Sequence, residues 1–274
     1  MRDLKRVVAS VFGEPWLIEP GKMELIAAVI EHAMEHGEPW AAPGADTSMK
    51  KSPAKCEMIG STAIIPISGV ITKKANLFSE ISGGASIELI DKQFTAALSD
   101  NAVKSIMFLI DSPGGAVSGV PEFASKVRDA RSKSPKPIIG YADGMAASAA
   151  YWIGAQCDEL YCSEAATVGS IGVVMQINDS TRAMKNAGYD PTTIRSSELK
   201  APGAGPLTPN QMGSLQDRVM QLFGMFKEAV LAGRPTIDLE AVATGDVWIG
   251  KRALAMGLVD GVCTMEQALY KVAQ

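Results

Sequence analysis

The chain has 274 residues, with 26 lysines and arginines against 30 aspartates and glutamates, and its only histidines are His32 and His36. The net charge of -4 offers no basic surface for nucleic acid, and a chain of this length can bury a core without disulfides or a structural metal. Any histidine base or histidine zinc ligand must come from those two residues, which restricts the possible catalytic chemistry.

The N-terminal part is expected to be a helix followed by a linker. In the helical N-terminal segment 1–37, apolar residues recur at helical spacing from Leu25 to Ala33. The stretch 38–55 is rich in proline and lysine without periodicity, which is typical of a flexible linker. The sequence therefore predicts that the folded domain covers 56–274.

From residue 56 onward, apolar runs typical of strands alternate with segments of helical spacing. Strands are expected at 61–71, 104–111, 137–143, 159–162 and 170–177, and helices at 86–100, 121–133, 146–156, 179–188 and 209–231. Because each strand is apolar throughout, the pattern predicts an α/β fold with a largely parallel sheet covered on both faces.

The cysteines and the hydropathy predict a cytoplasmic protein that is not secreted. The four cysteines contain no CxxC pair, so we expect reduced thiols. The opening run VVASVF is too short for a secretory signal, and no apolar stretch approaches the roughly eighteen residues of a membrane-spanning helix. We therefore expect no membrane partner.

Two adjacent glycines, Gly114 and Gly115, follow the strand expected at 104–111, in the sequence DSPGG. Glycine tolerates the backbone angles that point consecutive N–H groups at an anionic oxygen, as in an oxyanion hole. The same motif also suits a tight strand-to-helix turn, and both interpretations stay open on this motif alone. No GxxxxGK[ST] motif indicates a phosphate loop.

Ser148 follows the next strand, in the sequence GMAASAAYW, within the first turn of the helix expected at 146–156. Amide dipoles at a helix start favour a nucleophilic oxygen, although small residues there are also typical of close packing. DSPGG and Ser148 lie at the carboxyl ends of successive strands, where open parallel sheets bind ligands. This arrangement favours a shared site.

A serine nucleophile needs a base, which can be a histidine or a lysine. Both histidines precede the linker, so a Ser-His-Asp triad would require the N-terminal helix to fold back over the site. A lysine base must be neutral, so burial has to lower a lysine pKa from about 10.4 toward about 7. Lys200 is the candidate because we expect it at a strand-to-loop junction, although a lysine in a loop can also be simply solvated.

The segments DSPGG, ADGMAASAAYWIG, ATVGSIGVV, Lys200 and WIGKRALAMGLVDGV, in this order, resemble the signal peptide peptidase A family of serine proteases. The resemblance covers residues 60 to 265 and implies the Clp-protease/crotonase-like repeated ββα superhelix. It implies Ser148 as nucleophile, Lys200 as general base, and no cofactor or metal. It further implies Ser170 as support for the lysine, and an oxyanion hole from N–H groups of Gly114 or Gly115 and of Ser148 or Ala149.

The opening FGEPWLIEPGKMELIAAVIEH resembles the phage head maturation (prohead) proteases within this family. That resemblance implies cleavage of scaffold and capsid proteins inside an assembling procapsid, in the host cytoplasm. Relatives in the superfamily form rings, so a ring-like homo-oligomer is expected. The chain departs from many members in having Ala149 and Ala150 where they have two glycines.

Four alternatives stay open. The chain could be a bacterial cytoplasmic protease that degrades peptides, or a ring-forming assembly factor with a silent protease site. A crotonase-type acyl-CoA enzyme would share the fold but use acidic residues in place of the Ser148 and Lys200 pair. Finally, His32 and His36 form the HxxEH pattern of inverted zinc proteases, which needs a third ligand.

Overall fold

The computed structural model describes residues 16–18, 56–74, 84–177, 179, 181–190, 192–203 and 205–272. The helix expected within 1–37, the whole linker at 38–55 and both histidines lie outside these residues. The division into helix, linker and domain therefore stays a prediction.

The centre of the large sheet consists of three long, mostly buried strands, β3 (Thr62–Ser68), β6 (Ser105–Ser112) and β8 (Ile138–Ala147). They pair in parallel, β3 with β6 and β6 with β8. Apolar runs of this kind are typical of parallel strands with both faces covered. The α/β fold with a largely parallel sheet is thus confirmed.

Shorter strands complete the large sheet, whose path runs β11-β10-β8-β6-β3-β2. β8 branches, because its first half pairs with β9 and its last three residues pair with β10, both in parallel. The bounds are β2 (Glu57–Ile59), β9 (Glu159–Cys162), β10 (Thr167–Gly169), β11 (Val247–Ile249) and β12 (Gly261–Val262).

A second sheet of four short strands has the order β1-β7-β4-β5. β4 (Ile71–Thr72) follows β3 and β7 (Gly114–Ala116) follows β6, so these two long strands each continue into this sheet before the next helix begins, whereas β8 leads directly to a helix. This succession of two strands and a helix, seen twice, is the ββα unit that the family resemblance implies. The remaining members are β1 (Trp16–Ile18) and β5 (Ala85–Ser86).

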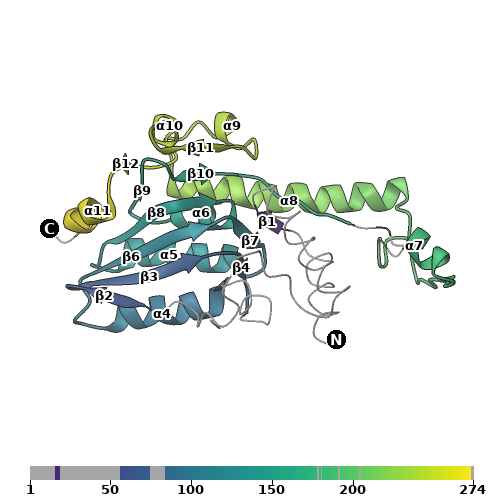
Figure 1. Cartoon of the computed structure of the whole chain (residues 1–274), viewed down its shortest axis with the longest axis horizontal. Coiled ribbons are helices and arrows are strands. Elements are labelled where there is room, and N and C mark those ends of the chain that lie inside the picture. The colour runs from purple at the N-terminus through teal and green to yellow at the C-terminus, as the bar shows by residue number, and fades with distance from the viewer. Residues whose placement is uncertain are drawn as a thin grey trace.

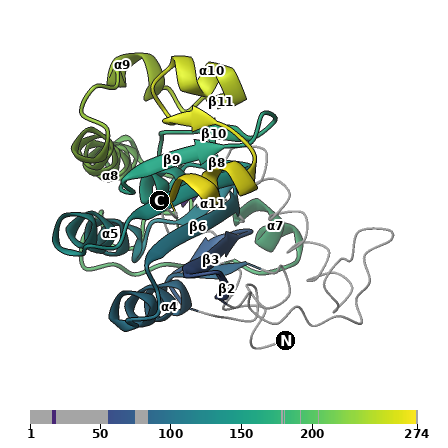
Figure 2. The same cartoon turned by 90° about the vertical axis from the view of Figure 1, so that its left-hand side faces the viewer.

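Helices cover both faces of the large sheet (Figure 2). α4 (Ile87–Ser99) and α5 (Val120–Lys133) pack on one face, where an aromatic cluster joins them to β6. The ring centroids of Phe94 and Phe108 lie 5.4 Å apart, and Phe123 meets both rings edge-on. α11 (Met265–Val272) packs on the other face.

Among the described residues, α8 (Pro209–Gly233) contacts the hydrophobic core near its C-terminal end. There, Phe226 stacks on Trp152 of α6 (Ala149–Gly154) with ring centroids 4.5 Å apart, and Val230 is also buried. The N-terminal part of α8 runs beyond the sheets toward α7 (Thr181–Asn186), as Figure 1 shows. It exposes apolar side chains, including Met212 and Met220.

Two short helices, α9 (Leu239–Val242) and α10 (Gly250–Ala255), complete the elements. In the part of the chain that the structure describes, no helix combines the length and the apolar character needed to cross a bilayer.

Three predicted boundaries were wrong. The strand expected to end at 143 continues to Ala147, because the end of β8 pairs with β10, and this pairing outweighs the helix propensity of the alanines. Ser148 therefore precedes α6 as its N-cap. The strand expected at 170–177 is replaced by β10 at 167–169, since Ser170 has a φ of 53° that ends the extended backbone.

The third wrong boundary concerns Lys200. The residues described between 192 and 200 include no strand, so Lys200 does not lie at a strand-to-loop junction. It lies instead in the irregular segment between α7 and α8.

The stacked pair of Trp152 and Phe226 makes the attachment of α8 testable. We expect Phe226→Ala to lower the free energy of unfolding by about 3–5 kcal/mol, because it leaves a cavity against the buried indole. Met212→Ala, on the exposed part of the same helix, should change it by no more than about 0.5 kcal/mol. Urea unfolding followed by circular dichroism measures both, and equal effects would show that α8 is not anchored through Phe226.

Candidate active site

Ser148 lies at a strained corner between β8 and α6. Its backbone has φ 54° and ψ -116°, a conformation that costs a residue with a side chain about 1–3 kcal/mol. The corner is held at both sides, since the Ser148 N–H donates to the Gly169 carbonyl (2.7 Å) and its carbonyl accepts from the Trp152 N–H (2.9 Å). Strain of this kind concentrates at functional sites.

The Ser148 side chain is fully buried, and its Oγ makes no hydrogen bond to any described residue. A buried hydroxyl normally has a partner, because leaving it without one costs free energy. A buried hydroxyl without a partner at the end of a central strand is the arrangement expected of a nucleophile whose general base is not in contact with it. The sequence predicted this position but assigned it to a helical turn.

The backbone of β7 approaches Ser148 so closely that only glycine fits. A Cβ on Gly114 would lie 3.0 Å from the Ser148 Cβ and 3.1 Å from the Ala147 carbonyl oxygen, and the φ of Gly114 is 100°. A Cβ on Gly115 would lie 2.0 Å from the Ile71 carbonyl oxygen. DSPGG is therefore more than a simple turn, because it brings a second backbone segment against Ser148.

The predicted oxyanion hole draws on backbone N–H groups of two residues next to Ser148, Gly114 and Ala149. The Gly114 N–H donates to Ser112 Oγ (3.2 Å), whose hydroxyl donates in turn to the Gly69 carbonyl (2.6 Å). Ala149 is the first residue of α6, where helix geometry gives the N–H no partner within the helix. Sequence reasoning missed Ser112, although its place in DSPGG could have indicated it.

Ser170 lies beside Ser148 at the end of the neighbouring strand. β8 and β10 run parallel with Ala147 opposite Gly169, so the next residue of each strand is the serine. Ser170 is 4% exposed, and its N–H donates to the Asp246 carbonyl (2.6 Å). Ser148 and Ser170 thus follow paired strand ends at one edge of the sheet, and the catalytic support by Ser170 stays a prediction.

Lys200 is not brought to Ser148. Its side chain is exposed and its N–H donates to the Ser197 carbonyl (3.1 Å). The segment that carries it leads into the end of α8 farthest from the sheets (Figure 1). The predicted base is therefore separate from the predicted nucleophile within the described chain.

The segment around Lys200 is attached to the start of α8 through Glu198. The Glu198 carboxylate accepts hydrogen bonds from the Thr208 hydroxyl and from Asn210 Nδ2, and these bonds lower the pKa of Glu198. Gln211 Nε2 donates to the Glu198 carbonyl oxygen (2.6 Å). Thr208 and Gln211 also form the capping box of α8, so Lys200 is held to this end of the helix.

The cysteines do not offer a second nucleophile. All four are free thiols. Burial raises the pKa of Cys157 to about 12 and that of Cys162 to about 11. Since only the thiolate is nucleophilic, both groups are inert near neutral pH.

A metal centre finds no support in the described residues. Among them, no group of three or more histidine, cysteine, aspartate and glutamate side chains is placed to hold an ion. The HxxEH pattern at His32 and His36 lies outside these residues, so the zinc alternative is not tested by the structure.

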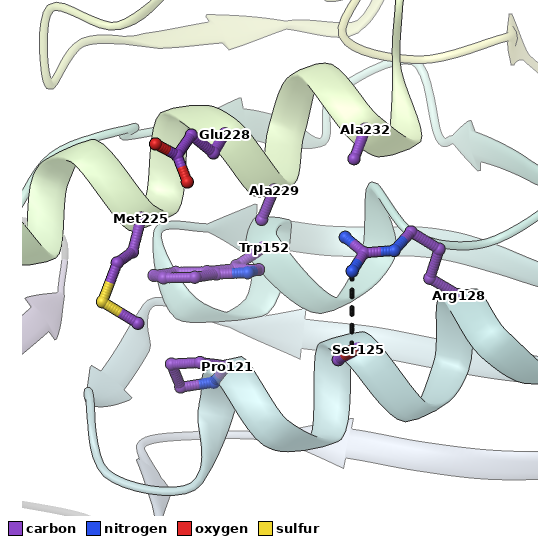
Figure 3. Close-up of a pocket in the computed structure, with 8 residues that line it drawn as sticks. All are labelled: Pro121, Ser125, Arg128, Trp152, Met225, Glu228, Ala229 and Ala232. Atoms are coloured by element: carbon purple, nitrogen blue, oxygen red, sulfur yellow. Dashed lines mark hydrogen bonds between the residues drawn. The ribbon is translucent and has the colours of Figure 1, made fainter.

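A groove of about 330 Å³ lies away from Ser148, between α5 and α8 (Figure 3). Arg128 donates a hydrogen bond to Ser125 on one wall, and Trp152 forms the floor below α8. Its lining residues are Pro121, Ser125, Arg128, Trp152, Met225, Glu228, Ala229 and Ala232. Because none of the predicted site residues is among them, this groove is not the candidate site.

Comparison with known proteins places these residues in a family context. The family model of peptidase family S49 matches residues 130–274. A putative protease of Methanocaldococcus jannaschii is 34% identical over 179 residues, which cover 64% of this chain and 57% of that protein. The probable protease SohB of Haemophilus influenzae is 30% identical over 176 residues, which cover 62% of this chain and 50% of that protein.

A phage protein is also similar. The capsid assembly protease C of Escherichia phage lambda is 25% identical over 292 residues, which cover 98% of this chain and 65% of that protein. The chain thus spans between half and two thirds of the length of these three relatives. The resemblance seen in the sequence motifs agrees with the family match, whereas the phage branch stays a prediction.

The backbone strain at Ser148 predicts an order of stability for two variants that both lack the hydroxyl. Ser148→Gly relieves the strain, offset in part by the greater freedom of glycine in the unfolded chain, so we expect it to exceed Ser148→Ala in stability by about 1 kcal/mol. Chemical denaturation of both variants measures the difference. An alanine variant as stable as the glycine variant would contradict a strained corner.

Proposed function

Because the chain belongs to peptidase family S49, we propose that it is a serine endopeptidase with Ser148 as nucleophile and Lys200 as general base. The observation that carries this proposal is the buried Ser148 hydroxyl, which has no partner among the described residues and sits on a strained corner beside the backbone of Gly114. A nucleophile presented in this way needs only a base and a peptide carbonyl.

The residues then have distinct roles. Ser148 Oγ attacks the peptide carbonyl carbon while the neutral Lys200 amine accepts its proton. N–H groups of β7, at Gly114 or Gly115, and of Ala149 stabilise the oxyanion. Lys200 next protonates the leaving amine, and a water molecule hydrolyses the acyl-enzyme. Ser170 positions the lysine amine beside Ser148.

The position of Lys200 adds a structural requirement to the dyad. Glu198 ties this segment to the start of α8, which extends beyond the sheets and exposes Met212 and Met220. A neighbouring copy that covers these methionines would bring its own Lys200 segment near another chain. We therefore propose that Lys200 reaches Ser148 from a second copy within a ring-like homo-oligomer.

Scaffold and capsid proteins are the proposed substrates, in the cytoplasm of a phage-infected host. The supporting observation is the share of this chain that each alignment covers. The alignment with the lambda capsid assembly protease covers 98% of this chain, whereas the alignments with the two cellular relatives described above cover 62–64%. The alternative functions are peptide degradation in a bacterial cytoplasm and ring assembly without catalysis.

Both members of the dyad can be tested with a co-expressed scaffold or capsid protein. We expect Ser148→Ala and Lys200→Ala each to lower the cleavage rate at least about a thousandfold, because each removes a group that acts in the chemical step. Lys185→Ala removes an exposed lysine of α7 near the same end of the molecule and should leave the rate unchanged. Quantitative gel electrophoresis of the products measures all three.

Mixing the two inactive variants shows which copy supplies the base. Co-assembly of Ser148→Ala with Lys200→Ala should recover about a quarter of the parental rate, because random pairing joins intact groups at that fraction of sites. If the Ser148→Ala variant cleaved at the parental rate, Ser148 would not be the nucleophile. No recovery in the mixture would assign Lys200 to its own chain, and an intact parent that assembles but cleaves nothing would favour the silent assembly factor.

The rate of peptide cleavage should rise with pH, because only a neutral lysine can accept the Ser148 proton. A chelator should leave the rate unchanged. Both are measured with a fluorogenic peptide across neutral and alkaline pH. A profile governed by a group near the histidine value of about 6.5, which disappears on substitution of His32 or His36, would contradict the lysine base.

A further inference from the structure

The short strand β1 lies between Val174 and β7, the strand whose backbone also approaches Ser148. It pairs antiparallel with β7, so that Trp16 lies opposite Ala116 and Ile18 lies opposite Gly114. Along its other edge, the Trp16 N–H donates to the Val174 carbonyl (2.8 Å) and the Val174 N–H donates to the Trp16 carbonyl (2.9 Å). We call the space between β7 and Val174 the β1 slot.

The Leu17 carbonyl reaches the site itself. The point where a Cβ on Gly114 would lie is 2.1 Å from the Leu17 carbonyl oxygen and 3.0 Å from the Ser148 Cβ. The carbonyl and the serine side chain therefore border the same small space. Trp16, Leu17 and Ile18 are 3%, 0% and 3% exposed, so the strand that borders this space is itself buried.

The contacts of β1 are those that an extended peptide makes in a protease cleft. Its partners are backbone groups on both edges, which any peptide sequence can supply. β7 consists of small residues, and a side chain at Gly114 would collide with the strand. The side chain of Leu17 packs into the main hydrophobic core, where only an apolar group of similar size fits.

A strand of three residues is also easily exchanged. It is shorter than the usual strand of about five or six residues and belongs to a small sheet of short strands, so its backbone pairing is limited to three residues. An external peptide could make the same pairs with β7 and Val174.

We propose that β1 is a built-in substrate mimic that occupies the peptide-binding slot, and that substrates bind as extended apolar strands by replacing it. This inference rests on the proposed function for the role of Ser148, and it adds an autoinhibitory segment and a substrate class. In a bound substrate, the residue that replaces Leu17 has an aliphatic side chain of about the size of leucine.

The test measures binding separately from catalysis. The probe is a fluorescently labelled peptide with the sequence of residues 14–20, EPWLIEP, and the full-length chain carries Ser148→Ala so that nothing is cleaved. Adding Leu17→Asp places a charge in the core and should displace β1. We expect fluorescence anisotropy to show at least tenfold tighter peptide binding than in the Ser148→Ala chain alone.

Two controls separate displacement from damage. Trp16→Pro removes the N–H that bonds to Val174 without introducing a charge, and it should raise binding in the same direction. Ile59→Asp makes the same kind of change at an exposed residue of β2 and should leave binding unchanged. A peptide with aspartate in place of its leucine should not bind.

Several results would overturn the inference. One is that the Ser148→Ala chain carrying Leu17→Asp or Trp16→Pro binds the peptide no more tightly than the Ser148→Ala chain alone. Loss of cooperative thermal unfolding in both variants is another, because β1 would then be an indispensable part of the core. If the peptide binds as expected but no chain with intact Ser148 and Lys200 cleaves it, the proposed function fails and the assignment of the slot stands.

Discussion

Parallel pairing of β8 with β6 on one side and with β10 on the other is the constraint on which the site depends. Because these strands run in the same direction, the residues that follow them meet at one edge of the sheet. Gly114, Ser148 and Ser170 come from three separate stretches of sequence, and each follows one of these three parallel strands. The strained backbone of Ser148 is held there by a hydrogen bond to Gly169, the last residue of β10.

Much of this arrangement could be predicted from local sequence. The apolar runs that became β3, β6 and β8, and the helical periodicity of α4, α5 and α8, reflect burial, which the residues themselves encode. The grouping of the glycines with Ser148 follows from the rule that parallel strands present their carboxyl ends together. Local sequence patterns, together with the motifs of the family, were therefore sufficient to predict these features.

The errors share a cause, which is dependence on partners far away in the chain. The end of β8 is extended because β10 pairs with it, and nothing within the alanine-rich sequence indicates that pairing. The signal for β1 is weaker still, since three apolar residues become a strand only in contact with β7 and Val174. Lys200 was predicted as the base because a serine nucleophile needs one, but its position depends on how the segment before α8 attaches to that helix.

The order of β1 and its partners along the chain has a consequence for synthesis. Ribosomes release a chain from its N-terminal end, so residues 16–18 emerge before β7, before Ser148 and before Val174. Residues 16–18 are therefore already present when Val174, the last of their partners in the β1 slot, is synthesised. A newly folded molecule reaches its first encounter with other proteins with its serine covered, and no separate inhibitor has to be present in the right place at the right time.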